Sequence, residues 1–390
     1  MCVNEYVMKT SYVNIRRSAL CGVLLALSTF AHAKDEPVSD ATPKVQIALL
    51  LDTSNSMDGL IDQAKTQLWR ICNTFIGSKV NGKEPILEIA LYEYGNVNID
   101  SAAHWVRQVE PLTRDLDEVS RELFALKTNG GDEYCGAVIQ RSITDLQWDD
   151  SPTTYKVIFI AGNEPFNQGP IDASQSCSKA KQKQVIVNSI YCGDKHLAIN
   201  ERWHDGPAMA DGVFLTINAN EVIQQIDAPQ DQEIARLNLL LNDTYIQWGQ
   251  YGSAMKMRQQ ACDTQANDHA KSGAAIERSI TKASANYCNA SWDIVDAVDQ
   301  KTIKLDNVDK TLLPKEMQAM THEQRVAHVA KLKAQRKGIQ DQILQLAKAR
   351  EEFLRKHRET IGKKDGNTLD QAAIKAVREQ AGKKGFQFQE

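Results

Sequence analysis

The sequence predicts an α/β protein in which a doubly wound, mostly parallel sheet is followed by an all-helical carboxy-terminal region. Residues 47–51 and 157–161 are short, continuously apolar runs, which is typical of strands buried on both faces of a sheet. Segments with the apolar spacing of helices separate these runs, as expected for a parallel sheet covered by helices on both sides. After about residue 228 the strand-like runs end and polar helical patterns replace them.

The predicted sheet elements follow one another in a regular order. Strands are expected at 44–52, 85–95, 103–112, 155–162, 184–193 and 212–218. Helices are expected at 60–75, 116–127, 133–146, 172–183 and 219–226. The second and third strands are close in sequence, so we expect a hairpin across residues 96–101.

The carboxy-terminal half is predicted to be helical. Helices are expected near 231–252, along a long polar stretch at 253–287, at 291–299 and at 369–380. Residues 321–361 carry an intermittent apolar seam that is interrupted at Gly338 and Arg350, which favours a packed helical hairpin over a long coiled coil. The predicted divisions are a signal peptide at 1–33, a linker at 34–44, a sheet domain at 45–228, a helical region at 229–362, and a linker with a last helix at 363–390.

The amino terminus carries a predicted secretory signal. Arg16 and Arg17 precede an apolar run at about 19–30, and Ala31 and Ala33 provide the small residues that a signal peptidase requires. That run is too short to span a membrane. We therefore expect cleavage after Ala33 and export, to the periplasm or alternatively to the outside of the cell. The formal net charge of −4 gives no basic field of the kind that binds nucleic acid.

Removal of the signal would leave an even number of cysteines. They are Cys72, Cys135, Cys177, Cys192, Cys262 and Cys288. Because exported proteins form disulfides, we expect at least one pair, with the connectivity left open and Cys72 remaining a buried free thiol. Cys262 and Cys288 can pair only if the helix between them folds back near Gly273.

The segment LLLDTSNSMDG at residues 49–59 places polar side chains directly after a predicted buried strand. Asp52, Ser54 and Ser56 alternate along the turn that leaves the strand. In parallel sheets, ligands bind beyond the carboxyl ends of the strands. A carboxylate and two hydroxyls on one tight turn are suitable ligands for Mg²⁺, Mn²⁺ or Ca²⁺. The alternative is that the serines only cap the helix that follows.

Two further loops at the same edge of the predicted sheet favour the cation site. KTNGGDEYCGAVI places Asp132 just before a helix, and IFIAGNEPF ends a strand with Gly162, Asn163 and Glu164. The predicted metal ligands are therefore Asp52, Ser54, Ser56, Asp132 and Glu164, with Glu164 acting through a water. Mg²⁺ is the preferred ion, and Mn²⁺ or Ca²⁺ are alternatives.

The catalytic motifs that come closest are incomplete. GSKVNGKE at 77–84 lacks the serine or threonine of a phosphate-binding loop, and His322 and His328 are six residues apart where a zinc protease needs four. There is also no GxSxG motif of a serine hydrolase. The sequence offers no paired nucleophile and base, which argues against an enzyme.

The three loops that carry the predicted metal ligands together resemble the von Willebrand factor type A domain over residues 45–228. Asp52, Ser54 and Ser56 match the DxSxS element of the family's metal ion-dependent adhesion site. The later segments VNSIYCG and WHDGPAMADGVFLTIN resemble a subgroup of exported bacterial proteins. The sequence departs from the family at Asp132, where threonine is usual, and at Gly162, where aspartate is usual. These departures could cancel, because Asp132 would restore the carboxylate lost at position 162; alternatively the site is degraded.

The resemblance implies a protein-binding module. A cation held at this site would bind a carboxylate of a protein partner, and the helical region would brace or extend the domain. Two alternatives remain open: a metal-dependent hydrolase that uses Glu164 or Glu133 as general base, and a structural or assembly factor whose metal site is vestigial.

Overall fold

The computed structural model describes residues 42–58, 60–217, 226–268, 273–360 and 369–388. Its strands are β1 (Lys44–Asp52), β2 (Ile86–Tyr94), β3 (Val106–Thr113), β4 (Tyr155–Gly162), β5 (Ile186–Cys192) and β6 (Phe214–Ile217). The helices around the sheet are α1 (Ile61–Asn73), α2 (Leu116–Ala125), α3 (Cys135–Asp145), α4 (Ala173–Gln182), α5 (Lys195–Asn200) and α6 (Asp205–Met209). The later helices are α7 (Asp231–Asn242), α8 (Gly252–Asp268), α9 (Ala274–Lys282), α10 (Ile294–Asp299), α11 (Lys315–Gln318), α12 (His322–Thr360) and α13 (Leu369–Gly382).

Four predicted features lie wholly or mainly outside the described residues. They are the signal peptide, most of the linker that follows it, the helix expected at 219–226, and the linker that begins at 363. No helix in the described part of the chain combines the length and hydropathy that crossing a membrane requires.

The six strands of the described chain form one sheet in the order β3-β2-β1-β4-β5-β6. Neighbouring strands are parallel except for β3, which pairs antiparallel with β2. The predicted doubly wound, mostly parallel sheet and the predicted hairpin are therefore confirmed. Strand order reverses between β1 and β4, and at such a switch point the loops that leave two adjacent strands diverge and open a crevice. Asp52 ends β1 at this crevice, and Gly162 ends β4.

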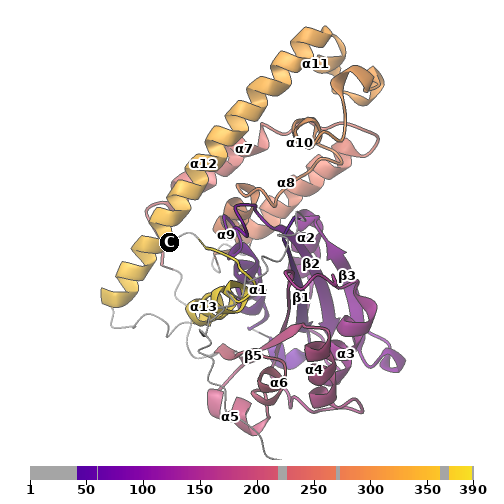
Figure 1. Ribbon diagram of the computed structural model, residues 1–390, viewed down its shortest axis with the longest axis vertical. Helices are drawn as coiled ribbons and strands as arrows, with labels where there is room; N and C mark the ends of the chain where they lie inside the picture. The colour runs from indigo at the N-terminus through magenta and orange to yellow at the C-terminus, as the bar shows by residue number, and fades with distance from the viewer. Residues whose placement is uncertain (1–41, 59, 218–225, 269–272, 361–368, 389–390) are drawn as a thin grey trace, which may run out of the picture. The chain divides into compact units, whose positions relative to one another are not determined.

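Strand β1 is apolar from Ile47 to Leu51, where both of its faces are covered. Val45, Ile47, Leu49 and Leu51 belong to one core cluster, and Ala48 and Leu50 belong to another. In Figure 1, α1, α9 and α13 lie on one side of the sheet and α3, α4 and α6 on the other. Burial on both faces keeps the strand rigid, so the turn that follows it starts from a fixed position.

The region after residue 228 is helical, as predicted, and shares the sheet's core. Ile234, Leu237 and Leu241 of α7 and Ile343 of α12 are buried in the same cluster as β1. The long polar stretch predicted at 253–287 forms two helices, α8 and α9, and Gly273 at the start of α9 has a φ of 82°, which glycine adopts without strain.

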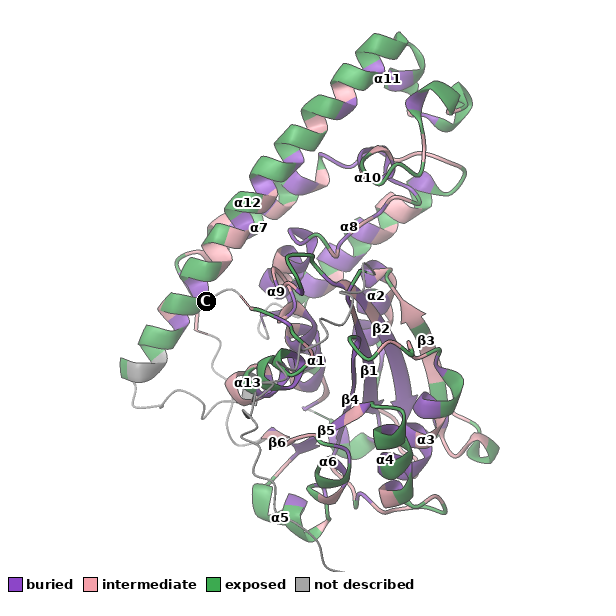
Figure 2. Cartoon of the chain, viewed as in Figure 1, coloured by how far each residue is buried: buried purple, intermediate pink, exposed green. Residues whose placement is uncertain are grey.

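The predicted helical hairpin at 321–361 is wrong, because α12 runs unbroken from His322 to Thr360. Gly338 makes no close approach that would require a glycine. Arg350 does not interrupt the buried seam but joins it, since its guanidinium is buried and pairs with Asp231 at 2.6 Å. In Figure 2 the buried residues of α12 form a stripe along an otherwise exposed helix.

The structure also contradicts the predicted disulfide, because all six cysteines are free thiols. Cys72 packs in the cluster on one face of the sheet, whereas Cys135 and Cys177 pack in the cluster on the other. Cys262 donates a hydrogen bond to the backbone oxygen of Asp117 and is not paired with Cys288, although the chain does reverse between α8 and α9. The prediction that Cys72 is a buried free thiol is confirmed, and burial raises its pKa to about 12.

Candidate metal centre

The turn after β1 gathers the oxygen atoms of the DxSxS element. Asp52 Oδ1 accepts a hydrogen bond from the backbone nitrogen of Ser54 at 2.8 Å. The hydroxyls of Ser54 and Ser56 lie 2.8 Å apart, and Ser56 donates to Asn163 Oδ1 at 2.8 Å. Neither Ser54 at the start of the short 3-10 turn (Asn55–Met57) nor Leu60 at the start of α1 makes a side-chain cap. The serines therefore do not serve as helix caps, which removes the simpler interpretation of the motif.

Asp52 lacks a partner for half of its carboxylate. Its side chain is fully buried, and Oδ2 makes no hydrogen bond. Burial raises the pKa of Asp52 to about 7; hydrogen bonds from Ser54 work against this rise, and the nearby charges of Glu133 and Glu164 add to it. A buried carboxylate oxygen without a partner is costly, and a cation bound beside Oδ2 would remove that cost.

Glu133 is the carboxylate that lies beside Asp52. A Cβ placed on Gly95 would be 2.7 Å from Asp52 Oδ1 and 2.9 Å from Glu133 Cγ, so the two side chains flank one point. Glu133 is 8% exposed. Burial first and Glu164 second raise its pKa to about 7, while hydrogen bonding from the Ser54 side chain opposes the rise. From the sequence, Glu133 is expected only as the general base of a hydrolase and not as a metal ligand.

Asp132 lies next to this group, with a different contact. It is partly buried, and its Oδ2 accepts a hydrogen bond from the Tyr134 hydroxyl at 3.3 Å. Its charge contributes to raising the pKa of Glu133. Within the loop that precedes α3, the structure thus brings Glu133 to Asp52 and directs Asp132 toward Tyr134.

Glu164 and Gly162 come from the loop after β4. Burial raises the pKa of the partly buried Glu164, and its charge acts on both Asp52 and Glu133. The backbone oxygen of Glu164 accepts a hydrogen bond from Trp203 Nε1 at 2.7 Å, which holds the loop in place. A Cβ at Gly162 would lie 2.4 Å from the Tyr94 hydroxyl and 3.1 Å from Asp52 Oδ2. A side chain cannot be accommodated at position 162, because Tyr94 fills that space.

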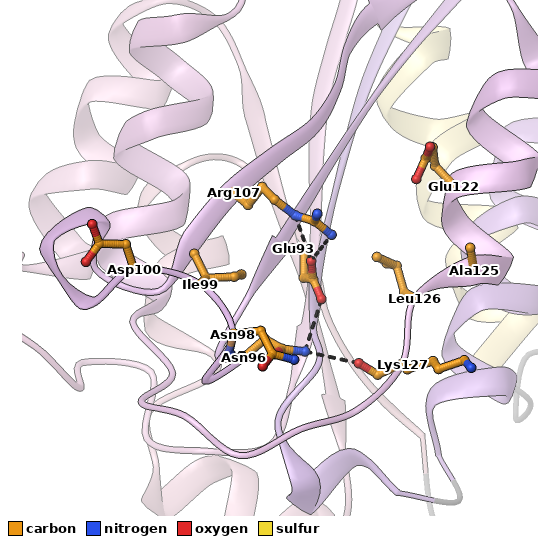
Figure 3. A pocket seen from close by; sticks show the side chains of 10 residues that line it. All are labelled: Glu93, Asn96, Asn98, Ile99, Asp100, Arg107, Glu122, Ala125, Leu126 and Lys127. Atoms are coloured by element: carbon orange, nitrogen blue, oxygen red, sulfur yellow. Dashed lines mark hydrogen bonds and ion pairs between the residues drawn. The ribbon is translucent and has the colours of Figure 1, made fainter.

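The turn is fixed from its other side by a polar network. Thr53 donates to Glu93 Oε1 at 2.9 Å, and Asn96 Nδ2 donates to the same oxygen at 3.2 Å and to the Lys127 backbone oxygen at 3.1 Å. Arg107 Nε donates to Glu93 Oε2 at 3.0 Å. Figure 3 shows Glu93, Asn96 and Arg107 among the residues that line a pocket of about 470 Å³, with Ile99 and Leu126 on opposite sides of Glu93. The buried Glu93 has a cation partner, which Asp52 lacks.

A second acidic cluster lies near α2. Carboxylate oxygens of Glu110, Glu118 and Glu122 lie within 4.8 Å of one another. Arg121 pairs with both Glu118 and Glu122, and Arg258 donates to Glu118 at 2.7 Å. These guanidinium groups neutralise the cluster from within the chain, so it gives no reason to expect a bound cation.

No protein-family model matches the sequence, and no curated protein matches it. Among solved structures, the conserved hypothetical protein BatB from Bacteroides thetaiotaomicron is 13% identical, with 45% of this chain and 90% of that chain covered and a TM-score of 0.35. The SpRpn10 VWA domain is 15% identical over 48% of this chain and 95% of that chain, with a TM-score of 0.35. The mussel byssus protein proximal thread matrix protein 1, solved with a zinc-occupied MIDAS motif, is 13% identical, with coverage of 47% and 43% and a TM-score of 0.35.

Proposed function

We propose that the sheet domain, which has the von Willebrand factor type A fold, is a cation-dependent protein-binding module of an exported protein. The observation that carries this proposal is the buried Asp52 Oδ2, which has no hydrogen-bond partner and no ion pair in the described chain. It lies beside the Ser54 and Ser56 hydroxyls, at the switch point of a parallel sheet. Such a position is where ligands bind in folds of this kind.

The residues present suit a hard dication. Asp52, Ser54, Ser56 and Glu133 would supply oxygen ligands, and Glu164 would act directly or through a water. Mg²⁺ is the preferred ion by the chemistry of this oxygen donor set, with Mn²⁺ or Ca²⁺ as alternatives. When bound, the cation would supply a positive centre for a carboxylate of a protein partner. The chain itself holds the turn rigid, excludes water from Asp52 and aligns the two serine hydroxyls.

Thermal unfolding with and without Mg²⁺ or Mn²⁺ tests the cation site. A ligand that binds only the folded state stabilises it by about 2.7 kcal/mol at a hundred times Kd. We expect wild type to show a rise in Tm and Asp52→Ala to show none. Asp58→Ala is the matched control, because Asp58 is exposed and its carboxylate contacts Thr128 outside the proposed ligand group. A wild type that responds to no divalent ion would contradict the proposal and favour a structural factor with a vestigial site.

The partner is tested separately. Immobilised wild type and Asp52→Ala would be incubated with envelope extract, with Mg²⁺ or with chelator. We expect a protein that is retained by wild type in Mg²⁺ alone and is released by chelator. Retention that is equal in all four samples would refute cation-dependent binding.

A further inference from the structure

We infer that Glu133 occupies, from within the chain, the coordination position that a carboxylate of a binding partner would otherwise take. The inference rests on the proposed cation site and concerns how that site is closed. It makes Glu133 the residue that decides whether an external carboxylate can reach the cation.

The placement of Glu133 supports this role. Its Cγ and Asp52 Oδ1 flank the same point above Gly95. In the described chain Glu133 has no ion pair. Its Oε2 accepts a long hydrogen bond from Gln168 Nε2 at 3.5 Å. The carboxylate is thus buried beside Asp52, and no cation of the described chain neutralises it.

The loop that carries Glu133 is anchored to the DxSxS turn itself. The backbone nitrogen of Asn129 donates to the Thr53 oxygen at 2.8 Å, and Asn96 holds the Lys127 oxygen. Glu133 also lies two residues before Cys135, which starts α3 and has a buried side chain. Both ends of the short segment 129–135 are therefore fixed, so the backbone keeps Glu133 beside Asp52 and only a rotation of its side chain can open the position.

The charges around the site lead to the same conclusion. Asp52, Glu133 and Glu164 bring three formal negative charges, and a dication neutralises two of them. A partner carboxylate would be a fourth negative charge in a largely buried site, where like charges repel more strongly than in water. The Glu133 side chain must move away before such a carboxylate can bind, whereas the cation itself can bind without a partner.

Mn²⁺ is a suitable probe because its effect on water-proton relaxation reports how many exchangeable waters the bound ion carries. We would measure the Kd for Mn²⁺ and the relaxivity of bound Mn²⁺ in wild type, Glu133→Gln and Glu133→Ala. Asp132→Asn is the matched control, because it removes a neighbouring charge from the same loop. Circular dichroism and the Tm in EDTA would confirm that each variant is folded.

We expect Glu133→Gln to weaken Mn²⁺ binding by at least about tenfold, since a charged ligand is lost. In Glu133→Ala the relaxivity of bound Mn²⁺ should rise, because water fills the vacated position. Added acetate should then lower that relaxivity in Glu133→Ala but not in wild type. Asp132→Asn should behave as wild type in all three measurements.

Two results would overturn the inference while leaving the proposed cation site intact. One is wild-type Mn²⁺ affinity and relaxivity in both Glu133 variants; the other is displacement of bound water by acetate in wild type as readily as in Glu133→Ala. An absence of Mn²⁺ binding by wild type would overturn the proposed function and this inference together. If Asp132→Asn reproduces the Glu133 effects, the role belongs to the charge of the loop and not to Glu133.

Discussion

Two regions of this molecule bury aspartates, but only one of them pairs the buried carboxylates with cationic side chains. Asp263 of α8 accepts hydrogen bonds from Arg278 Nε at 2.7 Å and from Lys282 Nζ at 2.8 Å. Asp117 of α2 accepts from Arg278 Nη2 at 2.8 Å and from the Tyr287 hydroxyl at 2.7 Å. Asp52 has no ion pair in the described chain, and one of its oxygens has no hydrogen bond.

The pKa values show the consequence. Burial works to raise the pKa of Asp263, but Lys282 and Arg278 outweigh it and lower the pKa to about 2. Burial raises the pKa of Asp52 to about 7, and the nearest charges, Glu133 and Glu164, raise it further. Burial alone therefore does not mark a functional carboxylate. The informative feature is a buried carboxylate for which the fold supplies no counter-charge.

The largest effect is expected from breaking the compensated network. Asp263→Asn should lower the free energy of unfolding by about 3–5 kcal/mol, because it leaves the buried Lys282 without its carboxylate and removes one of the two carboxylates that pair with Arg278. Urea denaturation monitored by circular dichroism would measure it. Arg236→Ala is the control: it removes an exposed ion pair with Glu233 and should change stability little. A loss for Asp263→Asn as small as that of the control would refute the comparison.

Replacing the other aspartate, Asp52, by asparagine should change the free energy of unfolding in the opposite direction. In EDTA at about pH 7.5, Asp52→Asn should raise the free energy of unfolding by about 2–3 kcal/mol, since it removes a buried charge that nothing neutralises. In saturating Mg²⁺ the order should reverse, because only wild type gains from the cation. Denaturation of both proteins in both buffers measures this crossover. Destabilisation by Asp52→Asn in EDTA would show that Asp52 is already satisfied within the fold.

A smaller effect is expected from pH. The folded-state pKa of Asp52 is raised from 3.8 to about 7, so between these values the folded protein binds more protons than the unfolded chain. The stability of the cation-free protein should therefore fall as pH rises, by about 1–2 kcal/mol between about pH 6 and about pH 8. Thermal melts in EDTA across this range would record it. Asp52→Asn should reduce the slope without abolishing it, because the pKa of Glu133 is also raised to about 7. Stability that rises across this range in EDTA would contradict the assignment.

Much of the fold follows from patterns that are local in the chain. The apolar run 47–51 predicts a strand buried on both faces, and alternate residues of β1 do pack on opposite sides of the sheet. The DxSxS element predicts three oxygen-bearing residues on one turn, because side chains at 52, 54 and 56 lie within a few residues of backbone. Periodicity and short-range geometry suffice for such features, since they involve contacts between near neighbours in sequence.

Other features depend on contacts between residues far apart in sequence. The sequence of α12 contains Gly338 and Arg350, but Arg350 is compatible with a continuous helix because Asp231, more than a hundred residues earlier, neutralises it. Cys72 cannot pair with Cys135 or Cys177, because the sheet lies between them. No pattern within a single segment contains this information.

In the candidate site, neighbouring residues include some features that local sequence predicts and others that depend on contacts between distant residues. The sequence by itself determined that a carboxylate from the loop before α3 comes near Asp52, since loops of a parallel sheet meet at its carboxyl edge. Only the tertiary structure decided that this carboxylate is Glu133, because the hydrogen bond from Asn129 to Thr53 sets the register of that loop. Likewise, only the packing of Tyr94 against β4 explains the glycine at position 162. Adjacent residues 132 and 133 make different contacts, and the contact between Glu133 and Asp52 joins residues far apart in sequence, which no local pattern specifies.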